Sequence, residues 1–163
     1  MPRLLTIGVY ELDADSFLAA LREADVRLLI DVRQRRGVRG PQYAWANSRR
    51  LQAALAEAGI AYTHRPDLAP TTELRELQYR EDDREGVGKR SRRRLADEYV
   101  RRYESEILED ADLGSLVDTL PAEGAGALLC VERDPAACHR SLIAARVATE
   151  FGIEVADLVP DAY

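Results

Sequence analysis

Short apolar runs alternate with segments of helical spacing through the first third of the chain. Residues 4–9 are apolar and β-branched and predict a strand, which is followed by Asp13 as a helix cap and by Phe17 and Leu21 at helical spacing. Residues 27–32 form a second strand-like run. Because this run is almost continuously apolar, it indicates a parallel sheet that is covered on both faces.

A long irregular segment and a third strand follow. Residues 33–46 contain two glycines and a proline without a hydrophobic period, and a connection of this length in a compact domain is commonly functional or mobile. Asn47 or Ser48 is expected to cap the next helix, which Gly59 ends. Residues 60–64 resume as a strand.

The alternation of strand and helix breaks after this strand and returns near the C-terminus. Residues 71–120 are polar and carry apolar stripes at helical spacing, whereas residues 125–131 form the most apolar strand of the chain. A final helix over residues 135–151, capped by Asp134, and a last strand over residues 153–159 complete the pattern.

These elements predict a single α/β domain over residues 1–163. The expected architecture is a Rossmann-like three-layer sandwich: a mostly parallel sheet of about five strands, helices on both faces, and a helical insertion at about residues 70–120. In such sheets, ligands bind beyond the carboxyl ends of the strands. The polar residues that end the strands are therefore expected to gather along one edge.

Composition narrows the class of protein. The chain is 46% hydrophobic and 32% charged, and it has no apolar run near the roughly 20 residues that span a bilayer. The N-terminus turns polar by Glu11 and has no small-residue cleavage site, so we expect a cytoplasmic protein without a signal peptide or membrane contact. The two cysteines provide no disulfide framework.

The net charge of −6 conceals a segregation of charge along the chain. Residues 32–56 contain six arginines and no acid, and residues 89–94, KRSRRR, form a second basic block. Residues 104–132 contain eight acids and no lysine or arginine. The folded chain is thus expected to carry a positive and a negative face. For residues 89–94 we favour a solvated surface that pairs with acids.

Eight residues form the candidate site at the predicted edge. The candidate catalytic groups, which can transfer protons, are Asp31, His64, Glu132 and His139. The candidate ligand-binding groups are Gly8, Arg33, Cys138 and Arg140. Arginine forks and the N–H groups at the start of a helix both stabilise anions, so an anionic ligand is expected. A structural role is the alternative for His139, as a half-buried residue, and for Cys130, as a small buried hydrophobe.

Three functions remain open for this site. The first is a pocket for an anionic small molecule, such as a phosphate or nucleotide, with hydrolase- or transferase-like chemistry. The second is a non-catalytic nucleic-acid-binding module, in which the Arg-rich loop contacts phosphates while Tyr43 and Trp45 stack on bases. The third, not favoured, is a structural zinc site at Cys130, Cys138 and His139. The eight-residue step between the cysteines matches no standard zinc finger.

Four motifs carry a family resemblance. They are TIG at residues 6–8, LLIDVR at 28–33, AGIAYTHRPDL at 58–68 and LLCVERDPAACHR at 128–140. In this order and spacing they resemble the bacterial and archaeal family named domain of unknown function 488. The resemblance implies a small α/β protein with a Rossmann-like sheet and no settled activity. The motif positions that it implies are Asp31, Arg33, His64, Cys130, Glu132, Cys138, His139 and Arg140.

Overall fold

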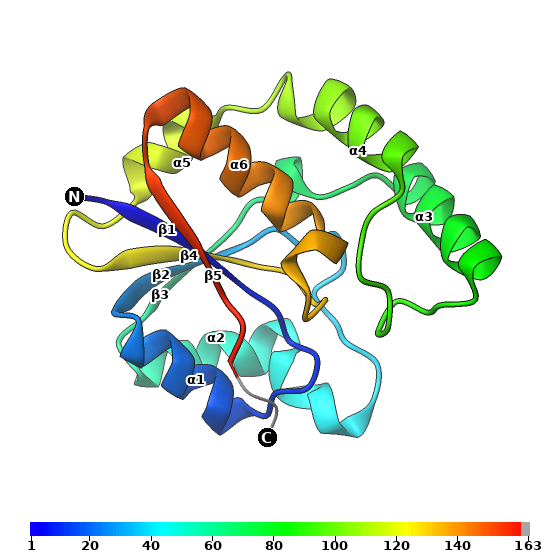
Figure 1. The fold of residues 1–163 in the computed structure, drawn as a ribbon. Coiled ribbons are helices and arrows are strands. Elements are labelled where there is room, and N and C mark those ends of the chain that lie inside the picture. Colours follow the sequence, from blue (N-terminus) through cyan, green and yellow to red (C-terminus); the bar gives the residue numbers. More distant parts are fainter. Residues whose placement is uncertain (161–163) are drawn as a thin grey trace.

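One parallel sheet organises the structure, a computed structural model that describes residues 1–160 (Figure 1). The strands lie in the order β3-β2-β4-β1-β5, and every neighbouring pair runs parallel. They are β1 (Arg3–Ile7), β2 (Val26–Asp31), β3 (Ala61–His64), β4 (Ala125–Leu129) and β5 (Glu154–Leu158). The predicted α/β class and the predicted parallel sheet are confirmed.

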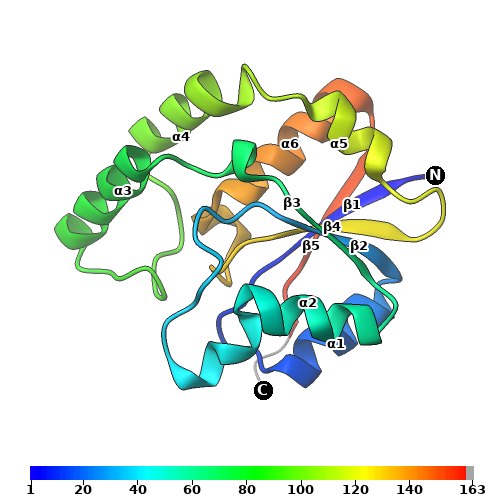
Figure 2. The same ribbon diagram turned by 180° about the vertical axis from the view of Figure 1, so that it is seen from behind.

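Helices cover both faces of the sheet, as Figures 1 and 2 show. On one face lie α1 (Ala14–Glu23), the short 3-10 helix η1 (Pro41–Ala46) and α2 (Ser48–Glu57). On the opposite face lie α5 (Leu113–Thr119) and α6 (His139–Phe151). These two layers and the sheet form the predicted three-layer sandwich.

The predicted helical insertion is present between β3 and β4. It contains the short 3-10 helix η2 (Pro66–Leu68), α3 (Thr72–Glu85), α4 (Asp97–Tyr103), the π-helical segment η3 (Glu104–Leu108) and then α5. Helices α3 and α4 lie on the α6 side of the sheet and reach past its edge (Figure 2). The insertion therefore extends the layer of α5 and α6 beyond the strands.

The sheet separates two hydrophobic cores, and successive residues of one strand alternate between them. The core on the α1 and α2 side includes Leu5, Leu29 and Leu129. The core on the α6 side includes Leu4, Ile30 and Leu128. Because both faces of β1, β2 and β4 are largely buried, both sets of alternating positions in these three strands must be apolar. This explains why the strands form nearly continuous apolar runs in the sequence.

The starts of two helices differ in how they are capped. Asp13 caps α1 as predicted: its side chain accepts from the N–H of Ser16 at 2.8 Å, and the Ser16 hydroxyl accepts from the N–H of Asp13 at 3.0 Å. Asn47 precedes α2, but its side-chain oxygen accepts from the N–H of Val38 at 2.8 Å instead of capping the helix. Asn47 thus holds the long loop after β2.

The prediction of one continuous helix over residues 135–151 is wrong. The segment begins with the 3-10 helix η4 (Pro135–Ala137), Cys138 is extended, and α6 begins at His139. The reason is Asp134, whose side-chain and backbone oxygens accept from the N–H groups of Ala136 and Ala137 at 3.0 Å each and close a separate turn. These two N–H groups, expected to face an anion, are used within the chain.

No helix among residues 1–160 combines the length and the apolar character that crossing a bilayer requires.

Gly8 allows the loop after β1 to lie directly on the loop after β4. The N–H groups of Val9 and Tyr10 both donate to the carbonyl of Val131 at 3.0 Å. A Cβ atom at position 8 would lie 2.9 Å from the carbonyl carbon of Glu132 and nearer still to its oxygen. The backbone of Glu132 cannot retreat without moving the loop that carries it, so the position requires glycine.

The Gly8→Ala variant is expected to lower the free energy of unfolding by about 1–3 kcal/mol, because overpacking forces the backbone to shift. Urea denaturation monitored by circular dichroism measures this change. Gly88→Ala is the control, because a Cβ atom there meets nothing within 4 Å. Equal stability of the two variants would contradict the close approach at Gly8.

Candidate functional site

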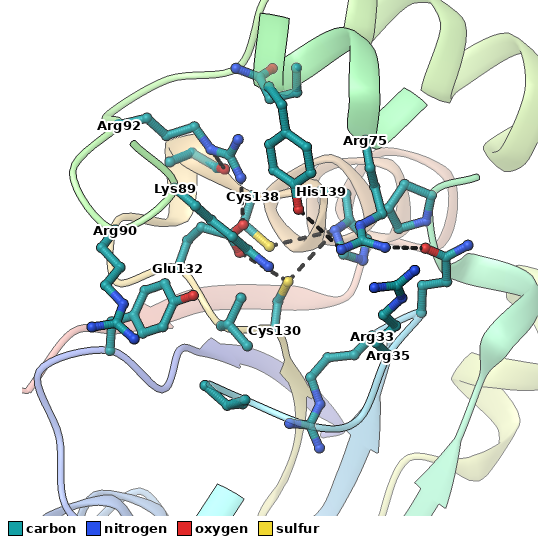
Figure 3. Close-up of a pocket in the computed structure, with 18 of the residues that line it drawn as sticks. Arg33, Arg35, Arg75, Lys89, Arg90, Arg92, Cys130, Glu132, Cys138 and His139 are labelled. Atoms are coloured by element: carbon teal, nitrogen blue, oxygen red, sulfur yellow. Dashed lines mark hydrogen bonds and ion pairs between the residues drawn. The ribbon is translucent and has the colours of Figure 1, made fainter. Parts of the chain in front are cut away.

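A cavity of about 450 Å3 lies at the carboxyl ends of β2 and β4 (Figure 3). Its lining comes from the loop after β2, helix α3, the loop between α3 and α4, and the segment from β4 to α6. The parallel register brings these parts together, since Asp31 at the end of β2 lies opposite His64 of β3 and Leu129 of β4. This is the edge at which ligands bind in α/β sheets.

The cavity has a strongly cationic lining in a chain whose net charge is −6. Its cationic residues are Arg33, Arg35, Arg39, Arg75, Lys89, Arg90 and Arg92. Among the described residues that line it, Glu132 is the one acid. The cavity therefore concentrates positive charge that the composition of the whole chain does not reveal.

Two of these cations are neutralised by buried carboxylates. Arg33 donates to Asp31 from Nε at 2.9 Å and from Nη2 at 2.8 Å. Arg92 donates from Nη1 to Asp82 at 2.8 Å and from Nη2 to Glu132 at 2.6 Å. The other five cations form no ion pair within 4.0 Å with a carboxylate of residues 1–160.

Two thiols and an imidazole meet at the wall of the cavity (Figure 3). Nδ1 of His139 lies 3.7 Å from Sγ of Cys130 and 3.6 Å from Sγ of Cys138, while its Nε2 lies 2.8 Å from the carbonyl oxygen of Val32. Because a carbonyl only accepts hydrogen bonds, Nε2 carries the proton and Nδ1 presents its lone pair to the sulfurs. The thiol of Cys130 donates to Oε2 of Glu132 at 3.1 Å.

Burial and neighbouring charges set the ionisation of the cavity wall. Burial raises the pKa of Glu132, but the positive charges of Lys89 and Arg92 outweigh burial and hold this pKa at about 2, below the usual 4.5. Burial lowers the pKa of Lys89, yet Glu132 and nearby phenols raise it above 10.5 overall. Burial raises the pKa of Cys130 well above its usual 9.0, and Cys138 adds to this increase. At neutral pH, Glu132 is thus a carboxylate and Cys130 a thiol.

Four of the eight candidate residues line the cavity and four do not. Those that line it are Arg33, Glu132, Cys138 and His139. Gly8, Asp31, His64 and Arg140 lie close to the same sheet edge, but the described structure uses each of them to hold the chain. Parallel strands thus bring all eight together, and the local contacts decide which ones reach the cavity.

Asp31 and Arg33 form a buried ion pair beneath the cavity. The side chain of Asp31 is fully buried, and its Oδ2 also accepts from the Tyr62 hydroxyl at 2.6 Å. The remaining Arg33 nitrogen, Nη1, donates to the carbonyl of Ala46 at 2.9 Å. This network fixes the long loop after β2 against β2 and β3.

His64 and Arg140 bind backbone carbonyl groups. Nε2 of His64 lies 3.0 Å from the carbonyl oxygen of Arg33. Arg140, which is fully buried, donates to the carbonyls of Glu132 at 2.6 Å and Arg133 at 3.1 Å. Gly8 lies against the same Glu132 carbonyl. These residues shape the two loops whose other side chains line the cavity.

The basic segment of residues 89–94 contributes cations to the site that were not predicted from the sequence. Lys89, Arg90 and Arg92 line the cavity, whereas Arg93 and Arg94 are exposed. The interpretation of residues 89–94 as solvated surface is therefore wrong for Arg92, which is buried. The signal that was available was the insertion itself, because a segment between two strands of one sheet must return to that sheet.

The aromatic residues of the loop after β2 pack inside the protein. Tyr43 is buried and its hydroxyl accepts from the N–H of Glu11 at 3.0 Å. The Arg90 guanidinium lies over the rings of Tyr10 and Tyr43, at 5.3 and 5.2 Å from their centroids. The ring of Trp45 packs on Phe17 with 4.9 Å between centroids. Tyr43 and Trp45 thus belong to internal contacts.

Comparison with protein families gives one match to the chain. The model of the family described as "Domain of unknown function DUF488" matches residues 13–147 of 163, which is most of the chain. Neither the curated proteins nor the solved structures contain a match to it. The motifs at residues 28–33, 58–68 and 128–140 lie wholly inside the matched region.

Asp31→Asn is expected to lower the free energy of unfolding by about 3–5 kcal/mol, because it leaves the buried Arg33 without a counter-charge. Urea denaturation at neutral pH checks this value. Asp25→Asn is the matched control: it breaks an ion pair with Arg27 in which both side chains are more than half exposed, so the change should stay below about 1 kcal/mol. Equal losses in both variants would contradict this role of Asp31.

The stabilising effect of the Glu132 carboxylate is expected to depend on acid pH. Its pKa in the folded protein, about 2, lies below the usual 4.5, so this stability is fully present above pH 4.5 and is lost as pH falls towards 2. The difference in unfolding free energy between the native protein and Glu132→Gln should therefore shrink over this range. Glu57→Gln, on the exposed surface of α2, serves as control. A difference that stays constant from pH 6 to pH 2 would refute this account.

Proposed function

Because the chain belongs to the DUF488 family, whose description states no activity, we propose a function from the cavity itself. The cavity binds a small anionic molecule that carries a phosphate group, of which a nucleotide is one example. Its volume of about 450 Å3 lies in the range of small-ligand sites, roughly 300–1,000 Å3.

The observation that carries this proposal is the set of cations without carboxylate partners. Their side chains are Arg35, Arg39, Arg75, Lys89 and Arg90. Like charges that face one cavity repel each other, and a bound anion removes that repulsion. Since the chain has more acids than bases, these cations are not the consequence of a basic composition.

Arg75 shows how the structure prepares a cation for an anion. Its Nη1 donates to Oε1 of Gln34 at 2.6 Å and its Nη2 to the Tyr79 hydroxyl at 3.0 Å. Both partners are neutral, so they hold the guanidinium in place without cancelling its charge. A guanidinium that is already oriented loses less conformational entropy when it binds a phosphate.

The hydrolase- or transferase-like chemistry included in the proposal depends on His139 and Glu132. Both groups line the cavity, so a bound anion is within their reach. Glu132 is ionised at neutral pH, but Arg92 and the Cys130 thiol already donate to its two oxygens, so Nδ1 of His139 is the better proton acceptor in the metal-free protein. Asp31 and His64 lie outside the cavity and hold the chain around it. His139 and Glu132 are therefore the remaining candidates for proton transfer.

Internal packing of the aromatic residues favours a small molecule over nucleic acid. Binding to single strands relies on exposed aromatic rings that stack on bases. Tyr43 is buried beneath Arg90, and Trp45 packs on Phe17.

Arg75→Gln and Arg90→Gln are each expected to weaken anion binding by about tenfold, since a hydrogen bond to a charged group contributes roughly 1.5 kcal/mol. Isothermal titration calorimetry with inorganic phosphate, pyrophosphate and AMP measures the affinities. Arg93→Gln is the matched control, because Arg93 lies in the same basic segment but is exposed and lies outside the cavity.

Two outcomes contradict the proposal. One is that none of the three anions binds, and the other is that Arg90→Gln and Arg93→Gln weaken anion binding equally. Salt dependence distinguishes the nucleic-acid alternative. A module that contacts six phosphates of single-stranded DNA loses roughly 300-fold in affinity between 50 and 200 mM salt. A small anion in this cavity should lose less than about tenfold.

A further inference from the structure

We propose that Cys130, Cys138 and His139 bind one Zn²⁺ ion at the wall of the cavity. The three ligand atoms are Sγ of each cysteine and Nδ1 of the histidine, and all lie within 4.8 Å of one another. All three residues are buried and all three line the cavity. Thiolate and imidazole are the ligands that zinc prefers in proteins.

The distances match the geometry of a zinc site. With zinc–sulfur bonds of about 2.3 Å and zinc–nitrogen bonds of about 2.0–2.1 Å, a tetrahedron separates sulfur from nitrogen by about 3.6 Å. Nδ1 of His139 lies 3.7 Å from Sγ of Cys130 and 3.6 Å from Sγ of Cys138. Both sulfur–nitrogen distances thus fit a tetrahedral site, and the two sulfurs lie within 4.8 Å of each other.

A carbonyl group orients the histidine for this task. Nε2 of His139 donates to the carbonyl of Val32 at 2.8 Å, which leaves the lone pair of Nδ1 directed at the sulfurs. Zinc-binding histidines regularly donate their other N–H to such a partner, which fixes the tautomer and the orientation of the ring. Val32 immediately follows β2, so the sheet itself holds the ring in place.

The chain path explains why the spacing of the cysteines differs from that of zinc fingers. Cys130 follows β4, whereas Cys138 is the extended residue between η4 and α6, and His139 begins α6. The turn of η4 brings Cys138 back beside Cys130. The ligands thus come from the end of a strand and the start of a helix, and no finger-type hairpin is needed.

The charge of the ion and of its ligands balances. Binding of Zn²⁺ releases the protons of both thiols to solvent, so two thiolates balance the two charges of the ion. The proton of Cys130 leaves from its contact with Oε2 of Glu132.

The protein offers three ligand atoms within 4.8 Å of one another from residues 1–160, and all three ligand residues line the cavity, so a fourth position would be open to it. Three protein ligands and an open position are typical of catalytic rather than structural zinc sites. In this respect the inference deepens the proposed function, because the open position is available to water or to an oxygen of the bound anion.

Metal titration tests the site directly. The full-length protein is reduced, stripped with chelator and titrated with Zn²⁺ and with Co²⁺. We expect one equivalent of either ion, and a Co²⁺ spectrum with thiolate-to-metal charge-transfer bands and the intense d–d bands of tetrahedral coordination. These readouts need neither substrate nor anion, so they stand even where no anion binds.

Variants identify the ligands. His139→Gln and Cys138→Ser are expected to weaken Zn²⁺ binding by at least about 100-fold, because loss of outer-shell partners alone typically costs about 10- to 100-fold. His64→Gln is the matched control, since His64 is the other histidine of the chain and lies outside the cavity. Circular dichroism confirms that each variant is folded before titration.

Three outcomes overturn the inference. One is a reduced native protein that binds less than half an equivalent of either metal. The second is a Co²⁺ spectrum without thiolate charge transfer, and the third is a Co²⁺ spectrum that His64→Gln and His139→Gln change equally. A protein that binds the metal but none of the three anions would instead refute the proposed function and still support the zinc site.

Discussion

The cavity depends on the contacts that the guanidinium of Arg92 makes. Its three nitrogens reach Asp82 of α3, Glu132 after β4, and the carbonyl of Ala137 in η4. One buried side chain thus joins the helical insertion to the segment that carries the cysteines and the histidine. Without this junction the loop between α3 and α4 has no charged anchor on the sheet, and Lys89 is no longer held near Glu132. Burying an arginine with two carboxylates carries a large desolvation cost, so this ion pair adds little net stability. Its main effect is to fix one arrangement of the insertion against the loop after β4.

Most of the fold could be predicted because strands buried on both faces have continuous apolar sequences. The runs at residues 4–9, 27–32 and 125–131 became β1, β2 and β4, and the polar insertion lies where its helical stripes placed it. The prediction that a helix starts at residue 135 was wrong for a local reason. Asp134 caps a separate turn, and a capping signal alone does not distinguish one turn from thirteen residues of helix.

The candidate site was harder to predict, because long-range contacts decide which side chains line the cavity. Arg140 follows the expected helix start, yet it donates to carbonyls of its own loop, and Asp31 holds Arg33. Neither of these contacts can be predicted from the spacing of residues in the sequence. The cations at 89–92 were missed although they lie in an insertion between two strands of one sheet, because the basic loop has no period that shows which side chains reach the cavity.

The order of the strands has a consequence for how the molecule assembles. Strand β1 pairs with β4 and β5, and β2 pairs with β3 and β4, so β1 and β2 never touch as neighbours. During synthesis the first strand has no pairing partner until residue 125 emerges. The N-terminal half can form the ladder of β2 and β3, while β1 waits for the strand that inserts between them. Arrival of β4 joins β1 to the ladder of β2 and β3, and β5 then pairs with the remaining edge of β1.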